Sequence, residues 1–443
     1  MQKLPYETPS IVKHTNLLAN KFGKSPSRRI LSHIDGVSVA ELMARHGSPL
    51  FIFSEKRIRA RFREAKRAFG TRYPKVQFSW SYKTNYLDAI CRIFHDEGSF
   101  AEVVSEMEYE MALRLQVPPE RILFNGPYKP THILQRALQD GARVHIDHMD
   151  ELYDAERLAE EAGQQYEVTL RLNMDTGIYP RWDRFGFNLD NGDAMSAVQR
   201  IVAGGKLRVT GLHCHIGTYV MEPNAYHIAA TKVAALARRI EAETDTPIAT
   251  LDLGGGFASP ATLHDQYSPG VDTAPRMDDY AEAITDALLD AGFSPQRMPT
   301  LILETGRALI DEAGYMAASV VANKRLADGT RAMIIDAGVN ALFTSFWYRH
   351  NISPVSDEGG IAETTAVYGP LCMNIDVVVP AVQLPHLAPG RAVVLHPVGA
   401  YNVTQWMQFI TLRPAVVLIR DNGDAVLIRR RETIDDVKAP ECP

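Results

Sequence analysis

Short β-rich runs alternate with amphipathic segments through the middle of the chain. In the amphipathic segments, such as 149–163 and 277–292, apolar residues recur every three or four positions, which is typical of a helix with one buried face. Because strands that alternate with helices form parallel βα units, eight such units predict a (β/α)8 barrel of the TIM type. The predicted strands are 77–82, 100–104, 121–125, 143–147, 167–173, 207–215, 250–253 and 300–304.

The pattern changes after about residue 315. Helical spacing ends there, and short strand-like runs punctuated by Pro and Gly follow. These runs predict an antiparallel β domain. The segment before the barrel is too short to fold alone, and we expect it to join the β domain because chain termini often lie close together. The predicted division is an N-terminal segment at 1–48, the barrel at 49–315 and the C-terminal β domain at 316–443.

Composition and charge narrow the class of protein. The 443 residues are 46% hydrophobic and 23% charged, as in ordinary globular proteins. The net charge is −6 without a basic block, which argues against a nucleic-acid partner. The four cysteines have no CxxC spacing, so we predict no metal site and no redox pair. No apolar run has the length of a membrane span and residues 1–25 lack a signal-like apolar core, so we predict a cytoplasmic protein without a membrane partner.

Chemically useful side chains fall where the predicted strands end. In barrels of this kind, the catalytic groups lie on the loops that follow the strands. Lys83, His215 and Glu304 end or follow three strands, and three glycines at 254–256 follow another. A lone lysine or histidine at such a position is more often structural, but together these residues converge on one mouth of the barrel.

Each of these residues suggests one part of a cofactor site. We expect burial to lower the pKa of Lys83, and a neutral amine attacks carbonyls, including that of an aldehyde cofactor. The glycines let backbone N–H groups approach an anion, and Arg307 adds a cation, so we predict a phosphate site. Glu304 needs a proton-donating partner such as a pyridine nitrogen, and the ring of His215 suits stacking on a cofactor. For the nearby His213 we keep a structural interpretation.

Nine motifs along the chain, in order, carry a resemblance to a known family. They are SYKTN, FAEVVSEME, RFGF, HCHIGT, LDLGGGF, ETGR, DAGVN, GPLCMNID and GAYN. With them the chain resembles the fold-type III decarboxylases that use pyridoxal 5'-phosphate (PLP), the group of diaminopimelate, ornithine and arginine decarboxylases. Its pattern is most similar to that of diaminopimelate decarboxylase. The resemblance implies an alanine-racemase-like barrel with a β domain, PLP as cofactor and a homodimer with shared active sites.

The resemblance also implies roles for the residues at matching positions. Lys83 matches the lysine that binds PLP as an aldimine, His215 the histidine that stacks on its ring, and Glu304 the partner of the pyridine nitrogen. Cys372 matches a cysteine, contributed by the other subunit, that protonates the quinonoid carbanion; taken alone, it would be interpreted as a small buried residue. The other positions assigned to the cofactor site are Glu102 (usually an aspartate), Arg171, Thr218 (usually a serine), Gly255, Gly256, Gly306, Arg307 and Tyr401.

The chain departs from the family at its substrate positions. Met373 follows the cysteine, where an acidic residue normally contacts the distal amine of the substrate. Thr344 replaces an arginine for the distal carboxylate of diaminopimelate, whereas Arg307 and Tyr348 are retained for substrate binding. Thr305 replaces a proline. Removing one charge of a buried pair costs several kcal/mol, so we expect poor activity with meso-diaminopimelate, lysine and ornithine.

The sequence therefore predicts a PLP-dependent amino-acid decarboxylase, a lyase that releases CO2. We expect its substrate to be a specialised amino acid, conjugated as in siderophore or other secondary-metabolite synthesis, or bound to a carrier. The alternative is a diaminopimelate decarboxylase of lysine biosynthesis. An amino-acid racemase is a minor alternative, because racemases of this fold have an arginine where Glu304 stands. A non-enzymatic PLP carrier would lack the C-terminal β domain.

Overall fold

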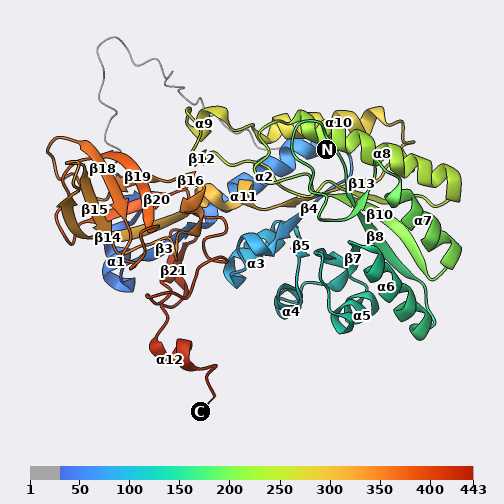
Figure 1. Ribbon diagram of the computed structural model, residues 1–443, viewed down its shortest axis with the longest axis horizontal. Helices are drawn as coiled ribbons and strands as arrows, with labels where there is room; N and C mark the ends of the chain where they lie inside the picture. The colour runs from blue at the N-terminus through green and yellow to red at the C-terminus, as the bar shows by residue number, and fades with distance from the viewer. Residues whose placement is uncertain (1–29, 443) are drawn as a thin grey trace, which may run out of the picture.

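Eight parallel strands form a closed barrel in the computed structural model, which describes residues 30–442 (Figure 1). Their order is β10-β11-β13-β4-β5-β6-β7-β8, and β8 pairs with β10 to close the ring. All eight predicted strands are confirmed, within one residue at each end. They are β4 (Val76–Ser81), β5 (Phe100–Val103), β6 (Ile122–Phe124), β7 (Arg143–Ile146), β8 (Tyr166–Asn173), β10 (Leu207–Cys214), β11 (Thr250–Asp252) and β13 (Thr300–Thr305).

Helices surround the barrel and bury one face each (Figure 1). In α6 (Met149–Ala162), the buried residues include Leu152, Ala155 and Ala159, at helical spacing. His148 caps its first turn by accepting the N–H of Glu151, and Gly163 ends it in a left-handed conformation with φ of 64°. The other barrel helices are α2 (Glu55–Gly70), α3 (Asp88–Asp96), α4 (Glu106–Arg114), α5 (Thr131–Asp140), α7 (Asp193–Gly204), α8 (Asn224–Thr244), α10 (Met277–Asp290) and α11 (Arg307–Ile310).

A second, mainly antiparallel sheet forms the β domain at the left of Figure 1. The long strand β14 pairs with β3, β15 and β20, and the order β19-β18-β15-β14-β3-β21-β22 runs through it. Two pairs, β15–β18 and β3–β21, are parallel. The strands are β3 (Leu50–Ser54), β14 (Gly314–Arg325), β15 (Arg331–Ile335), β17 (Asn351–Pro354), β18 (Glu363–Tyr368), β19 (Val377–Leu384), β20 (Ala392–His396), β21 (Ala415–Ile419) and β22 (Ala425–Arg429).

The predicted start of the barrel at residue 49 needs a correction. Strand β3 pairs with β14 and β21, so it belongs to the β-domain sheet and the first barrel element is α2. Its five residues are all buried, because they lie in the middle of that sheet. Before β3, Ile34, Val39 and Leu42 pack against the same sheet. Residues 1–29 of the predicted N-terminal segment, including the stretch inspected for a secretion signal, lie outside the described residues.

Short elements complete the chain. The pairing of β12 with β16 links a barrel loop to the β domain. Between residues 30 and 442, no helix has both the length and the apolar character needed to cross a membrane. The short elements are β1 (His33–Ile34), β2 (Val37–Ser38), α1 (Val39–His46), β9 (Phe187–Asn188), β12 (Thr262–Leu263), α9 (Gly270–Thr273), β16 (Tyr348–Arg349) and α12 (Ile434–Lys438).

Candidate active site

Lys83 lies in a single helical turn, Tyr82–Thr84, directly after β4. Its Nζ is 2.5 Å from Oε2 of Glu102, a buried residue on the neighbouring strand β5. Burial acts to lower the pKa of Lys83, but the nearby carboxylates of Glu102 and Glu304 outweigh it and raise this pKa. The prediction of a lowered pKa is therefore wrong, because the ion pair holds the amine in its charged form.

Glu304 is the penultimate residue of β13 and carries a buried carboxylate. The Asn125 amide donates a hydrogen bond to Oε1 of Glu304, and Nε2 of His213 lies 3.4 Å from Oε2. Nδ1 of His145 lies 4.0 Å from Oε1 of Glu304, at the limit of ion-pair distance. Burial lowers the pKa of both histidines well below the usual value, so they are neutral. Among the residues described, no charged side chain thus lies within ion-pair distance of Glu304, which suits the protonated ring nitrogen of a ligand.

Asp252, on β11, completes the buried group around Glu304. The ligating atoms of Asp252, Glu304, His145 and His213 all lie within 4.8 Å of one another. Burial, and then the negative charge of Glu304, raise the pKa of Asp252 well above its usual range. Asp252 is therefore the protonated member of the carboxyl pair. We interpret the group as the support of Glu304 rather than a metal site, because the Asn125 amide already donates to that carboxylate.

His215 follows β10 and presents its ring to the cavity that Lys83 reaches. Its Nδ1 accepts the backbone N–H of Gly255 at 3.1 Å. Burial lowers the pKa of His215 to about 3, so the ring is neutral and its single proton is on Nε2. A neutral, flat imidazole held in this way suits stacking on a planar cofactor ring. The indole of Trp182 lies beside it, with ring centroids 5.2 Å apart.

Two glycine segments form a cradle at the same mouth of the barrel. A Cβ added at Gly255 would lie 2.2 Å from the carbonyl oxygen of Glu304, and one at Gly256 would lie 2.1 Å from that of Gly217. At Gly306, a Cβ would lie 2.3 Å from Oγ1 of Thr84. Only glycine fits these three positions, and two of them, Gly256 and Gly306, line the cavity, where an anion could approach their backbone.

Arg307 lies between two tyrosine rings in this cradle. Its guanidinium carbon is 4.5 Å from the ring centre of Tyr348 and 4.8 Å from that of Tyr401. Asp311 is 3.7 Å from its Nη1. Although burial opposes the charge, Asp311 raises the pKa of Arg307, so the guanidinium remains a cation in the cavity.

The loop before β21 joins the β domain to the Lys83 turn. The backbone N–H of Tyr401 donates to the carbonyl of Thr84, and Oγ1 of Thr404 donates to the carbonyl of Lys83. Tyr401 adopts a left-handed φ of 65°, which is uncommon for a tyrosine and found at positions held by their surroundings. The β domain therefore fixes the backbone that carries the lysine.

These groups line a cavity of about 510 Å³ that fits PLP. Lys83 is available to an aldehyde, His215 to a planar ring and Glu304 to a ring nitrogen, and the glycine segments offer a cradle for phosphate. Of the predicted site residues, those that line the cavity are Lys83, His215, Thr218, Gly256, Glu304, Gly306, Arg307, Tyr348 and Tyr401. Glu102 and Gly255 do not line the cavity, but each bonds to a residue that does. Glu102 accepts from the amine of Lys83, and the backbone N–H of Gly255 donates to His215.

Besides Glu102 and Gly255, four predicted site residues do not line this cavity. Arg171 pairs with Asp147 at 3.2 Å. The hydroxyl of Thr344 bonds to Asn402 and His350 in the β domain. The other two, Cys372 and Met373, lie in the loop between β18 and β19.

Sequence reasoning missed seven other residues that line the cavity, which are Ser81, Trp182, Tyr219, Phe257, Leu263, Trp347 and Gln405. Trp182 precedes the RFGF motif in the loop after β8, and Trp347 precedes Tyr348. Gln405 follows the GAYN motif. Trp182, Trp347 and Gln405 lie close to a motif or to a residue already assigned to the site, so their neighbourhood was the available signal. What placed them in the cavity is the folding of those loops over the barrel mouth.

The neutral buried histidines predict a loss of stability in mild acid. A histidine whose folded pKa lies below the unfolded value destabilises the fold by about 1.4 kcal/mol per pH unit as pH falls below about 6.5. Burial raises the pKa values of Glu108 and Asp252. Each of these carboxyls therefore stabilises the fold as the pH falls, by about the same free energy per pH unit as one histidine destabilises it. The histidines with the most strongly lowered pKa values are His145, His213, His215 and His350. Burial also lowers the pKa values of His46 and His95 and raises those of Asp336 and Asp376, and these two smaller effects oppose each other.

Four histidines against two carboxyls leave a net loss of about 2–3 kcal/mol in the free energy of unfolding between pH 6 and pH 5. Urea unfolding of the cofactor-free protein at these pH values measures it. An unfolding free energy that stays level or rises over this interval would contradict the assignment of neutral histidines.

Comparison with known proteins agrees with this chemistry. The family described as "Pyridoxal-dependent decarboxylase, pyridoxal binding domain" matches residues 55–311. Diaminopimelate decarboxylase of Actinosynnema pretiosum is 33% identical over 91% of this chain and 91% of its own length, and that of Methanothermobacter thermautotrophicus is 29% identical over 91% and 94%. The crystal structure of diaminopimelate decarboxylase from M. jannaschii has a TM-score of 0.85 at 28% identity, covering 94% of this chain and 98% of that one. This chain therefore belongs to the pyridoxal-dependent decarboxylases, and it is a PLP-dependent carboxy-lyase that acts on an amino acid.

Proposed function

We propose that this enzyme decarboxylates diaminopimelate, the alternative that the sequence analysis considered second. The observation that carries the proposal is likeness over the whole chain: relatives named diaminopimelate decarboxylase cover 91–93% of it at 26–33% identity. A relative of known structure was solved in complex with L-lysine. The retained Arg307 and Tyr348 at the cavity support a substrate that carries a carboxylate.

The residues of the cavity divide the work between binding and proton control. PLP, when bound, accepts the electron pair that remains on the substrate when CO2 leaves. The carboxylate of Glu304, beside Asp252, whose pKa burial raises, would hold a positive charge on the ring nitrogen. His215 would hold the ring in the barrel mouth, and Glu102 orients the amine of Lys83 through the bond between them. The two tyrosines beside Arg307 exclude water from its guanidinium.

Cys372 does not line the cavity of its own chain, which supports a contribution from a second subunit. We therefore propose a homodimer in which each site takes Lys83 from one chain and Cys372 from the other. Mixing the inactive variants Lys83→Ala and Cys372→Ala after unfolding and refolding should then restore about a quarter of wild-type turnover, because half of the dimers are mixed and each holds one intact site. Turnover that stays at the level of the separate variants would contradict a shared site.

Met373 and Thr344 favour a second candidate, an amino acid without charged distal groups. Met373 cannot pair with an ammonium group, and the Thr344 hydroxyl is already bonded to Asn402 and His350. No arginine stands at position 344 to bind a distal carboxylate. This candidate is a specialised or conjugated amino acid, and it differs from the first only in what occupies the outer end of the pocket.

One assay separates the two candidates. CO2 release by the PLP-loaded enzyme is measured with meso-diaminopimelate, lysine and ornithine at equal concentrations. The proposed function predicts release from meso-diaminopimelate that exceeds the other two by at least about tenfold. Absence of release from all three, with the visible absorbance of bound PLP intact, would reject the proposal and favour the second candidate. Loss of that absorbance would instead indicate an unloaded enzyme, so it serves as the control.

A further inference from the structure

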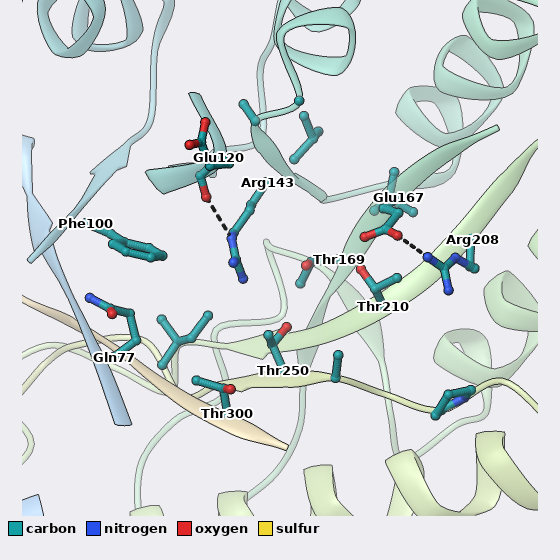
Figure 2. A pocket seen from close by; sticks show the side chains of 17 residues that line it. Gln77, Phe100, Glu120, Arg143, Glu167, Thr169, Arg208, Thr210, Thr250 and Thr300 are labelled. Atoms are coloured by element: carbon teal, nitrogen blue, oxygen red, sulfur yellow. Dashed lines mark hydrogen bonds and ion pairs between the residues drawn. The ribbon is translucent and has the colours of Figure 1, made fainter. Parts of the chain in front are cut away.

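A second cavity, of about 560 Å³, opens at the opposite end of the barrel from Lys83 (Figure 2). Lys83, His215 and Glu304 follow or end their strands, whereas the residues around this cavity lie at or near the beginnings of the same strands. The interior of such a barrel is normally filled by layers of large branched side chains. A cavity of this size at the amino-terminal mouth therefore needs a local explanation.

One layer of the barrel explains the space. Thr169, Gly211, Thr250 and Thr300 are paired in register on four adjacent strands. All four residues are small, and a Cβ at Gly211 would lie 2.4 Å from Oγ1 of Thr250 and 2.6 Å from Oγ1 of Thr169, so glycine gives room for these two hydroxyls. The register of β10 shifts just before Gly211, which brings Thr210 to the cavity as well.

The hydroxyl groups of this layer are free to bind a ligand. Within residues 30–442, the side-chain oxygens of Thr169, Thr210, Thr250 and Thr300 form no hydrogen bond to protein groups. Hydroxyls that line a cavity without protein partners are available as donors to an acceptor that enters it. Figure 2 shows three of them, Thr169, Thr250 and Thr300, facing the same space.

Arg143 brings an unpaired cation to the same space. Its guanidinium lies 5.5 Å from the ring centre of Phe100, and its Nε donates to the carbonyl of Glu120. In the described part of the chain it forms no ion pair, whereas the nearby Arg208 is paired with Glu167. The end of the Arg143 side chain extends into the cavity toward the threonines (Figure 2). Two of its guanidinium nitrogens thus have no protein acceptor.

We propose that this amino-terminal cavity binds a small organic anion. Its anionic group would pair with Arg143 and accept hydrogen bonds from the threonine hydroxyls, which together form a site for a carboxylate or a phosphate. Phe100, Val144 and Ile302 line the remainder of the cavity and suit a short apolar body. The site is separate from the catalytic chemistry, so a ligand there leaves the Lys83 mouth accessible.

The test uses the PLP-loaded enzyme, whose phosphate cradle at the catalytic mouth is already filled. Inorganic phosphate and butyrate are titrated separately at constant ionic strength, and binding is measured by calorimetry and by the shift in Tm. We expect saturable binding of at least one probe. Saturation by butyrate alone assigns a carboxylate ligand, and saturation by phosphate alone assigns a phosphate ligand.

Matched variants locate the binding. Arg143→Gln should weaken it at least about tenfold, and Thr250→Val, which keeps the shape of the side chain, about threefold. Arg121→Gln is the control: Arg121 stacks on the same Phe100 ring, at 5.9 Å, but does not line the cavity, so binding should stay within about twofold of wild type. No saturable binding of either probe by the wild type, unchanged binding in Arg143→Gln, or equal loss in Arg121→Gln would each overturn the proposal. Circular dichroism and PLP absorbance check that every variant is folded.

Discussion

Replacing Lys83 by alanine will remove both the visible absorbance of bound PLP and the release of CO2. The lysine is the amine at the cavity that an aldehyde meets, and its backbone is fixed by Thr404 from the β domain. Loss of a covalent nucleophile should lower kcat by at least about 10³-fold. The measurement is an absorption spectrum after dialysis against PLP, followed by a CO2 assay of the same sample.

A surface lysine provides the control for this variant. Lys206 is also ion-paired with a carboxylate, Glu160, but lies on the outside of the barrel. Lys206→Ala should keep the absorbance and the turnover of the wild type. Decarboxylation at a wild-type rate by Lys83→Ala would contradict the role that we propose for this residue.

Glu304→Gln will bind PLP and yet turn over about 10²–10³-fold more slowly. Glutamine keeps an oxygen that accepts from Asn125, so the cavity should retain its shape. It cannot stabilise a positive charge on the ring nitrogen, and without that charge the cofactor is a weaker electron acceptor. PLP affinity, the absorption spectrum and kcat, measured side by side, separate this electronic effect from a loss of binding.

Asp252→Asn is the matched comparison for Glu304→Gln. Because burial and Glu304 raise the pKa of Asp252, its side chain is already neutral, and an amide of the same shape should cost less than about tenfold in kcat. An equal loss of kcat in Asp252→Asn and Glu304→Gln would show that the negative charge is not localised on Glu304. Wild-type turnover in Glu304→Gln would contradict the pairing of this carboxylate with the cofactor.

Local patterns were sufficient to predict the barrel strands and the residues at their carboxyl ends. A parallel strand is a short apolar run, and each one in this barrel was found within one residue at either end. Because the carboxyl ends of all strands in a barrel open on one mouth, Lys83, His215 and Glu304 could be assigned to one cavity before their distances were known. The prediction that PLP binds there follows from the same residues and from the family motifs.

Other features depend on contacts between distant parts of the chain. The apolar run that became β3 has the same appearance as a barrel strand, and only its pairing with β14 and β21 assigns it to the other sheet. Thr344 was placed at the substrate by its position after the DAGVN motif, but its hydroxyl is bonded to Asn402, 58 positions away. Hydrogen bonds of this kind have no local sequence signal.

The sequence by itself determined the alternation of strands and helices, the chemistry present at the barrel mouth and the family. The tertiary structure alone decided the charge of Lys83, since the register of β4 against β5 brings Glu102 to its amine and reverses the pKa shift expected from burial. It also decided that the hydroxyls of Thr169 and Thr250 meet beside Gly211 at the amino-terminal end of the barrel, because the pairing of three strands places them where a Cβ at Gly211 would lie. In both cases the physical reason is the same: electrostatic and packing energies depend on distances between atoms, and the register of neighbouring strands sets those distances.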